Sequence, residues 1–273
     1  MAGRVLIGTQ GWNYPAWVGP FYPDGTRPAA MLSLYAQAFG TVEVDSTFYA
    51  IPPVNSVRGW AARTPDGFIF SLKLPQEITH ERQLRRSAAE TELFIERARL
   101  LGPKLGPILV QMGPEFGPAD FDALEAFIPT LPGDLRFAVE LRRSEWTKPD
   151  VLPDLLGLLR DHGVALALSD GRWMPRDTVL ELAMEPTAGF HYLRWMGPNR
   201  DLTDFSHVQV DRAAEVDAWA GVLRGLPARG IDIFGYANNH FEGHSPSSAR
   251  DIQRLLGVAP VDPRQIGDQI SLF

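Results

Sequence analysis

Cysteine and long hydrophobic runs are both missing from this chain of 273 residues. Without thiols there is no disulfide, no cysteine nucleophile and no thiolate ligand for zinc. No apolar stretch approaches the roughly 20 residues of a membrane-spanning helix, and the first residues enter an apolar strand without a signal-peptide layout. We therefore expect a cytoplasmic protein that makes no use of a membrane.

Basic charge is also scarce. The chain has 26 lysines and arginines against 33 aspartates and glutamates, which gives a net charge of −7. This balance argues against broad, sequence-independent binding to nucleic acid, because such binding depends on a basic surface. No Gly-x-Ser-x-Gly elbow, Ser-His-Asp order or P-loop occurs, so acyl transfer and nucleotide hydrolysis of those types find no support.

What the chain does contain is a regular alternation of short β-branched runs and longer helical stretches. The runs predict eight strands, at residues 4–8, 41–45, 68–73, 108–111, 135–141, 164–168, 191–195 and 231–236. Helices are predicted at about 28–39, 54–63, 87–101, 118–129, 149–162, 211–226 and 245–257. Residues 169–188 contain two prolines and predict an irregular, lid-like excursion with a short helix near 178–184.

This alternation predicts an α/β protein built as a single (β/α)8 TIM-like barrel over residues 1–257, because such barrels take about 250 residues. An open doubly wound sheet is the alternative. The eight strand signals and the lack of a glycine-rich phosphate turn after the first strand count against it.

Polar residues gather at the carboxyl ends of the predicted strands, where barrels place their active sites. Side chains two apart share a face of a strand, so Glu43 lies beside Asp45 and Glu140 beside Arg142. Buried charges are costly unless they are paired, so this cluster requires mutual compensation or a ligand. The predicted catalytic residues are Glu140, Lys73, Glu43, Asp45 and His80. The predicted substrate-binding residues are Trp12, Tyr14, Tyr49, Gln111, Arg142, Asp170, Arg194, Asn238, Asn239 and His240.

Within this set, Glu140 is the predicted general acid or base, and Lys73 and Arg194 are the predicted partners of an anionic group. Trp12 and Tyr14 would stack on a base or sugar, although they would serve equally as hydrophobic cover. One alternative is a purely structural plug in which Glu43, Glu140, Lys73 and Arg194 neutralise one another. No cofactor is predicted. A divalent metal on oxygen ligands is a lesser alternative, because the nearby cations compete for the same carboxylates.

Short motifs spread along nearly the whole chain resemble those of the YecE-like family, catalogued as domain of unknown function 72. They are Gly8–Trp12 with Trp17, Phe21–Pro23, Val42–Tyr49, Phe70–Lys73 with Thr79 and His80, Val139–Arg142 and Tyr236–His240. The resemblance implies a TIM-like barrel. It implies no catalytic role, since the family's activity is not established. Members often have Tyr-Phe-Asn-Asn where this chain has alanine at position 237.

Residues 258–273 form a predicted C-terminal tail, and its first part, residues 258–268, is rich in proline and glycine, which predicts an extended chain. Its last five residues resemble the pentapeptide by which bacterial polymerases and repair proteins dock on the DNA sliding clamp. The predicted partner-binding residues are Gln269, Ile270, Ser271, Leu272 and Phe273. The alternative is that the three apolar members of this set fold back against the barrel.

The leading hypothesis is therefore a hydrolase that acts on a phosphate-bearing substrate, a nucleic-acid strand or a nucleotide, and is recruited to the sliding clamp by its tail. A carbohydrate or small-molecule hydrolase or isomerase that uses Glu43 and Glu140 is the first alternative. A non-catalytic adaptor that only displays the tail is the second.

Overall fold

The fold is a closed barrel of eight parallel strands, seen in a computed structural model that describes residues 2–198 and 201–267. Each strand pairs with the next along the chain, and β1 pairs with β8 from Val5 opposite Ile233 to Thr9 opposite Ala237. The predicted (β/α)8 barrel is thereby confirmed. The strands are β1 (Val5–Gln10), β2 (Thr41–Val44), β3 (Ile69–Lys73), β4 (Leu105–Gln111), β5 (Phe137–Glu140), β6 (Ala165–Gly171), β7 (Phe190–Gly197) and β8 (Asp232–Ala237).

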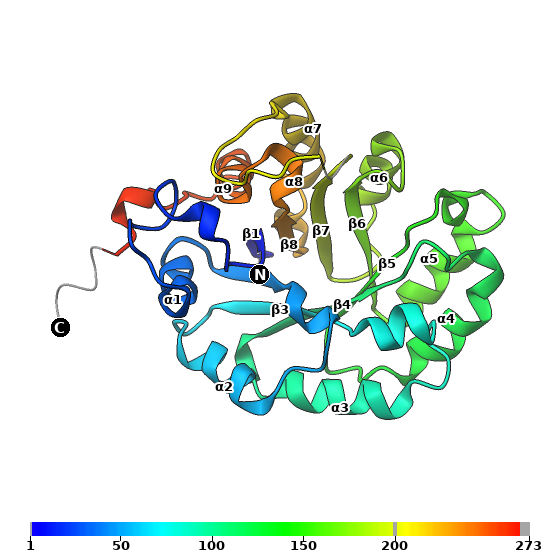
Figure 1. Cartoon of the computed structure of the whole chain (residues 1–273). Coiled ribbons are helices and arrows are strands. Elements are labelled where there is room, and N and C mark those ends of the chain that lie inside the picture. Colours follow the sequence, from blue (N-terminus) through cyan, green and yellow to red (C-terminus); the bar gives the residue numbers. More distant parts are fainter. Residues whose placement is uncertain (1, 199–200, 268–273) are drawn as a thin grey trace.

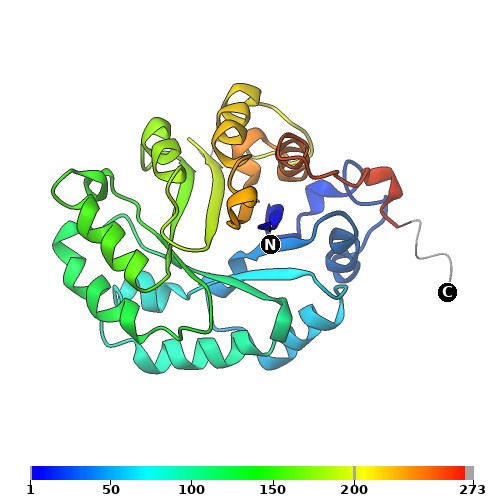
Figure 2. The same ribbon diagram turned by 180° about the vertical axis from the view of Figure 1, so that it is seen from behind.

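The helices lie outside the ring of strands (Figure 1), and the view from behind shows the same arrangement (Figure 2). They are α1 (Pro28–Ala38), α2 (Val54–Ala62), α3 (Ala88–Arg99), α4 (Phe121–Phe127), α5 (Leu152–Asp161), α6 (Arg176–Ala183), α7 (Ala213–Leu223), α8 (Asn239–Glu242) and α9 (Ser245–Leu255). No helix in the described part of the chain is long and apolar enough to span a membrane.

Three details differ from the sequence prediction. The helix predicted at 118–129 is α-helical only over α4, because prolines introduce a 3-10 turn on each side of it. Strand β6 continues to Gly171, beyond its predicted end, and the short helix predicted near 178–184 is α6, which begins two residues earlier. The one-turn helix α8 was not predicted, since four residues are too few to display a helical period.

Two hydrophobic cores result from this arrangement. The larger one lies between the strands and the surrounding helices, and the smaller one fills the inside of the barrel. Inside the barrel, the Tyr236 hydroxyl lies 2.5 Å from the Ser71 hydroxyl and 3.0 Å from that of Thr41. This hydroxyl layer separates the apolar interior from the charged residues nearer the carboxyl ends of the strands.

The segment that follows α9 lies against the barrel as far as the structure describes it. Ile266 is buried, and the Gly267 backbone N–H donates to the Gln37 side chain at 2.9 Å. Residues 258–267 are therefore docked beside α1 rather than extended into solvent. The five predicted clamp-binding residues, Gln269 to Phe273, lie outside the described residues.

Candidate functional site

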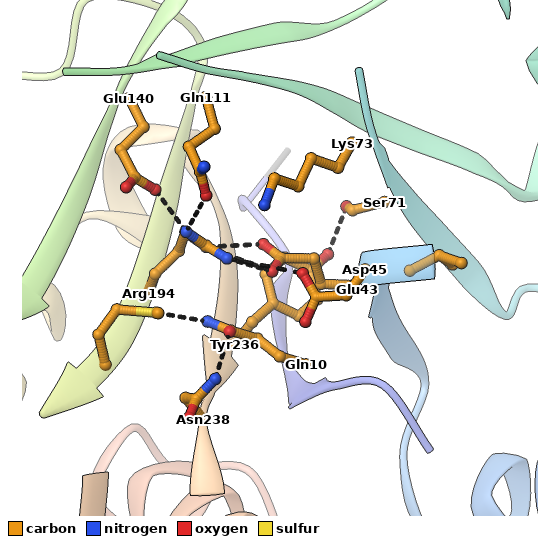
Figure 3. Close-up of polar contacts among 12 residues, drawn as sticks. Gln10, Glu43, Asp45, Ser71, Lys73, Gln111, Glu140, Arg194, Tyr236 and Asn238 are labelled. Atoms are coloured by element: carbon orange, nitrogen blue, oxygen red, sulfur yellow. Dashed lines mark hydrogen bonds and ion pairs between the residues drawn. The ribbon is translucent and has the colours of Figure 1, made fainter. Parts of the chain in front are cut away.

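Arg194 lies at the centre of the candidate site and reaches from β7 across the barrel (Figure 3). Its Nη2 donates to Glu43 Oε1 at 2.7 Å, and its Nε donates to Glu43 Oε2 at 3.0 Å. Its Nη1 donates to Glu140 Oε2 at 2.6 Å and to Gln111 Oε1 at 3.0 Å. Each of these four side chains belongs to a residue that is no more than 2% exposed.

Two further residues complete this ion network, which we define as Glu43, Gln111, Glu140, Arg142 and Arg194 with the Tyr192 hydroxyl. Arg142 donates from Nε to Glu140 at 2.7 Å and from Nη2 to Gln111 at 2.6 Å. The Tyr192 hydroxyl donates to Glu43 Oε2 at 2.6 Å. Two carboxylates thus face two guanidiniums, and the network is electrically balanced.

The two carboxylates of the network differ in their pKa values. Burial raises the pKa of Glu43 and outweighs the opposing effect of Arg194. Burial acts on Glu140 as well, but Arg194 and Arg142 together outweigh it and hold the pKa of Glu140 far below its ordinary range. Glu140 is consequently ionised at every physiological pH.

A cavity of about 510 Å³ opens above the network at the carboxyl ends of the strands. Strands β1, β3 and β4 end on polar side chains that face it, namely Gln10, Lys73 and Gln111. Its complete lining is Gln10, Tyr14, Asp45, Ser46, Phe48, Tyr49, Lys73, His80, Gln111, Arg142, Arg194, Met196 and Asn238.

Lys73 is the cation of this cavity whose charge the network does not compensate. Its Nζ lies 3.9 Å from the centre of the Phe48 ring. No carboxylate of the described residues comes within ion-pair distance of Nζ, and the residue is only 7% exposed. Burial, reinforced by the nearby charge of Arg194, lowers the pKa of Lys73 to about 8.

Asp45 supplies the carboxylate of the cavity. It begins a short 3-10 helix (Asp45–Phe48) directly after β2, and its Oδ1 is 3.8 Å from Arg194 Nη2. Its side chain is 35% exposed, in contrast to the buried Glu43 two residues earlier. Asp45 is thus open to a substrate and to water.

His80 closes the side of the cavity next to Lys73. It lies on a short π-helix (Glu77–Glu81), with its ring edge-on to Phe48 at 4.9 Å between ring centres. A Cβ at Gly113 would come within 2.9 Å of the His80 ring, so glycine is required at that position. Burial and the charge of Lys73 lower the pKa of His80 to about 4, so the ring is neutral at pH 7.

Gln10 and Asn238 join the first and last strands across the remaining wall. Asn238 Nδ2 donates to Gln10 Oε1 at 2.7 Å, and Gln10 Nε2 contacts the Met196 sulfur at 2.9 Å. The Tyr14 hydroxyl donates to the Gln10 backbone carbonyl at 3.1 Å. Tyr49 lies at the mouth of the cavity and is 73% exposed.

Three predicted substrate-binding residues lie elsewhere, and the structure corrects their placement. Asp170 points out of the barrel, where it accepts two bonds from Arg176 and one from Trp219. Trp12 packs edge-on against Trp60 of α2. Asn239 is buried and accepts hydrogen bonds from Trp17 and Ser245, so its role is to hold the start of α9. His240 lines a smaller hollow beside the cavity.

Several cavity residues were not identified from the sequence. Gln10 was missed because the first strand was ended at Gly8, two residues too early. Met196 carries no polar group that would single it out. Tyr192 was missed because its contact with Glu43 spans the barrel, and the contact is therefore invisible to strand periodicity.

The arrangement offers an acid, a base and a place for an anion. A desolvated ammonium with a pKa of about 8 gives up its proton more readily than an ordinary lysine. A half-exposed carboxylate can orient and deprotonate water. Among the described residues, no three His, Asp or Glu side chains are placed to hold a metal ion together.

Comparison with known proteins gives consistent matches. The family model described as "Protein of unknown function DUF72" matches residues 6–268. The UPF0759 protein YecE of Escherichia coli (strain K12) is 31% identical over 169 residues, which cover 62% of this chain and 60% of that protein. The matched part is therefore less than two thirds of that relative's length. The UPF0759 protein YunF of Bacillus subtilis (strain 168) is 25% identical over 96% of this chain and 99% of that protein.

Two solved structures share the fold. A DUF72 family protein from Enterococcus faecalis V583 has a TM-score of 0.73 at 20% identity and covers 94% of this chain and 99% of its own. A DUF72 family protein from Thermotoga maritima MSB8 has a TM-score of 0.74 at 22% identity and covers 93% of this chain and 99% of its own. At these identities the likeness concerns the barrel alone.

Proposed function

We propose that this chain, which belongs to the DUF72 family of proteins of unknown function, is a hydrolase that acts on a phosphate-bearing substrate in the cavity above the ion network. The resemblance to this family seen in the sequence motifs is confirmed. The observation that carries the proposal is the Lys73 ammonium, which faces the cavity without a carboxylate partner among the described residues.

A buried cation without a carboxylate partner favours the binding of an anion. The Lys73 ammonium faces the cavity, where it would contact an anionic group of the substrate. A phosphate oxygen beside Lys73 would replace the water that the ammonium has lost through burial. Arg142 provides a second positive group on the same lining, although Glu140 and Gln111 already take two of its N–H groups.

In the proposed step, water attacks phosphorus while the bond from phosphorus to the leaving oxygen breaks. Asp45 takes the proton of the attacking water, and Lys73 gives its proton to the leaving oxygen. Both roles follow from the environments already described, because Asp45 is open to water and Lys73 has a lowered pKa. The sum of the step is the substrate plus one water giving a phosphate and an alcohol.

Glu140, the residue predicted as acid or base, is unsuited to that role. It is buried, it is bonded to two guanidiniums, and its lowered pKa deprives it of a proton to donate. The carbohydrate alternative is disfavoured for the same reason, since Glu43 and Glu140 are both occupied by Arg194. We assign the network to positioning, with Lys73 and Asp45 as the reacting pair.

Turnover of phosphate esters by purified Lys73→Met and Asp45→Asn variants tests this assignment. We expect each variant to lose turnover by about 100-fold or more, the usual contribution of a general acid or base. Thr147→Val, a change in a surface 3-10 turn (Ser144–Thr147), is the control. Full activity in both site variants, or no activity in the wild-type protein on phosphate monoesters, diesters and nucleotides, would reject the proposal.

Recruitment to the DNA sliding clamp remains a proposal that rests on the sequence from Gln269 to Phe273. A tail peptide of this kind binds modestly, and the ring on DNA then supplies local concentration. Binding of the full chain to a bacterial sliding clamp, compared with the double variant Leu272→Ala and Phe273→Ala, decides it. Equal binding, or none in either case, would remove the clamp from the proposed function.

A further inference from the structure

A second, smaller hollow of about 150 Å³ adjoins the cavity and shares Arg142, Met196 and Asn238 with it. Its lining consists of Arg142, Arg172, Trp173, Met196, Gly197, Pro198, Asn238 and His240. The residues come from the ends of β5, β6, β7 and β8, so the hollow continues the same rim of the barrel.

At Gly197, the backbone that lines this hollow passes very close to a neighbouring segment of the chain. This glycine has a φ of +74°, and a Cβ there would lie 2.3 Å from the His240 backbone carbonyl oxygen. Only glycine allows the end of β7 to pass so close to helix α8. The hollow is thus a fixed feature of the rim.

Two arginines lie against the Trp173 ring in this hollow. The guanidinium carbon of Arg172 is 4.4 Å from the ring centre, and that of Arg142 is 5.4 Å from it. Cation–π contacts of this kind hold a guanidinium in place without neutralising its charge. Among the described residues, no aspartate or glutamate lines the hollow.

A count of charges shows where positive charge is left over. With Glu43 and Glu140 both ionised, the two carboxylates of the ion network balance its two guanidiniums. Lys73 and Asp45 both line the cavity but form no ion pair with each other, and Asp45 lies nearest to Arg194, at 3.8 Å. The exposed Arg172 makes no ion pair within residues 2–198 and 201–267, so the two linings contain a second cation, besides Lys73, that has no carboxylate partner.

We propose that this hollow is a second anion-binding subsite, which takes another phosphate of the substrate that is bound beside Lys73. The inference rests on the proposed function and narrows its substrate to a compound that carries two phosphate groups. Arg142, at the boundary of the two linings, lies between the positions of the two groups. Successive phosphates of a short nucleic-acid strand and the two phosphates of a sugar bisphosphate share this chemistry.

The test measures the gain in affinity that a second phosphate brings. Thymidine monophosphate is compared with a thymidine dinucleotide that carries a terminal phosphate, and fructose monophosphate is compared with fructose bisphosphate. Titration calorimetry is done on the wild type, on Arg172→Gln, on Lys73→Met and on the control Arg58→Gln, which removes an exposed arginine of α2 that lines neither the cavity nor the hollow. Melting temperatures check that the exposed substitutions leave folding intact.

We expect Arg172→Gln to weaken binding of the two-phosphate ligand of at least one pair by about tenfold, and to leave the one-phosphate ligands unchanged. The pair that responds identifies whether the substrate is a strand or a small bisphosphate. If one-phosphate ligands bind through Lys73 but the second phosphate adds nothing, the subsite is refuted and the proposed function stands. If Lys73→Met leaves all binding unchanged, or no ligand binds, both are refuted.

Discussion

Two sets of charged side chains meet at the carboxyl end of this barrel, and the protein treats them in opposite ways. In the ion network, Glu43 and Glu140 are fully buried and each is bonded to Arg194. In the cavity directly above, Lys73 and Asp45 share a lining but form no ion pair with each other. The charged groups of the ion network already have hydrogen-bonded partners of opposite charge, whereas Lys73 and Asp45 can still bind a ligand.

This contrast separates residues that hold a site from residues that react in it. A buried charge that already has all its partners is stabilised little by a ligand. Removal of one partner, however, leaves the other charge unpaired in a medium of low polarity. A charge that has lost its water and has no partner is stabilised by a ligand of opposite charge. The location of charges at strand ends therefore identifies the site, and the partners of each charge indicate its role.

The largest expected effect comes from Arg194→Met, which leaves two buried carboxylates without their shared partner. We expect the free energy of unfolding to fall by about 3–5 kcal/mol. Urea unfolding followed by circular dichroism measures the change, and Arg58→Met on the surface of α2 serves as the matched control. A loss below about 1 kcal/mol, the size typical of exposed pairs, would contradict the contrast between the two sets.

Glu140→Gln should have a smaller effect, since the amide keeps one acceptor for Arg194 and Arg142 but loses the charge. We expect a loss of about 2 kcal/mol in unfolding free energy at neutral pH. The pKa of Glu140 is lowered in the folded state, so its contribution is present above its unfolded pKa and declines as pH falls below about 4. Urea unfolding of both proteins from pH 7 to pH 3 should show the gap narrowing; a constant gap would mean that charge plays no part.

The pH dependence of turnover tests the proposed role of Lys73 as the proton donor. Lys73 must carry a proton to donate one, and its pKa is about 8. The rate should therefore decline above that value and be about tenfold lower at pH 9 than at pH 7. In Lys73→Arg the guanidinium stays protonated throughout this range, so the residual rate should lack the decline. The same decline in both proteins would assign it to another group.

Asp45→Asn should have the smallest effect on stability. Its side chain is partly exposed and lies 3.8 Å from Arg194, so the pair is weak in comparison with the network contacts. We expect the unfolding free energy to change by less than about 0.5 kcal/mol, although turnover is lost. A stability loss equal to that of Glu140→Gln would place Asp45 within the network.

The sequence predicted the barrel and the charged rim because both depend on local periodicity. Alternation along a strand placed Glu43, Lys73 and Glu140 toward the inside, which the structure bears out in their contacts and the cavity lining. Asp170 was assigned to the rim because it follows the predicted sixth strand, not by alternation. Strand β6 includes it, and alternation from Ala165 and Ala167 inside the barrel places it on the outer face, toward α6 and α7.

Pairings across the barrel could not be predicted in the same way. Of the four residues proposed as a neutral plug, Arg194, Glu43 and Glu140 do pair, but Lys73 does not. Which carboxylates Arg194 reaches depends on the tilt of the strands and the length of each side chain, neither of which strand alternation records. Only the three-dimensional structure therefore separates the charged residues that pair with one another from Lys73, which does not.

Arg194 also has a consequence for the order in which a growing polypeptide can be completed. The ribosome delivers Glu43 and Glu140 well before Arg194, and Gln10 precedes its partner Asn238 by 228 residues. Until the seventh strand is synthesised, Glu43 has no guanidinium partner and Glu140 has only that of Arg142. Because Arg194 lies in the last third of the chain, the cation that pairs with both carboxylates is synthesised after them, and the ion network can be completed only late in translation.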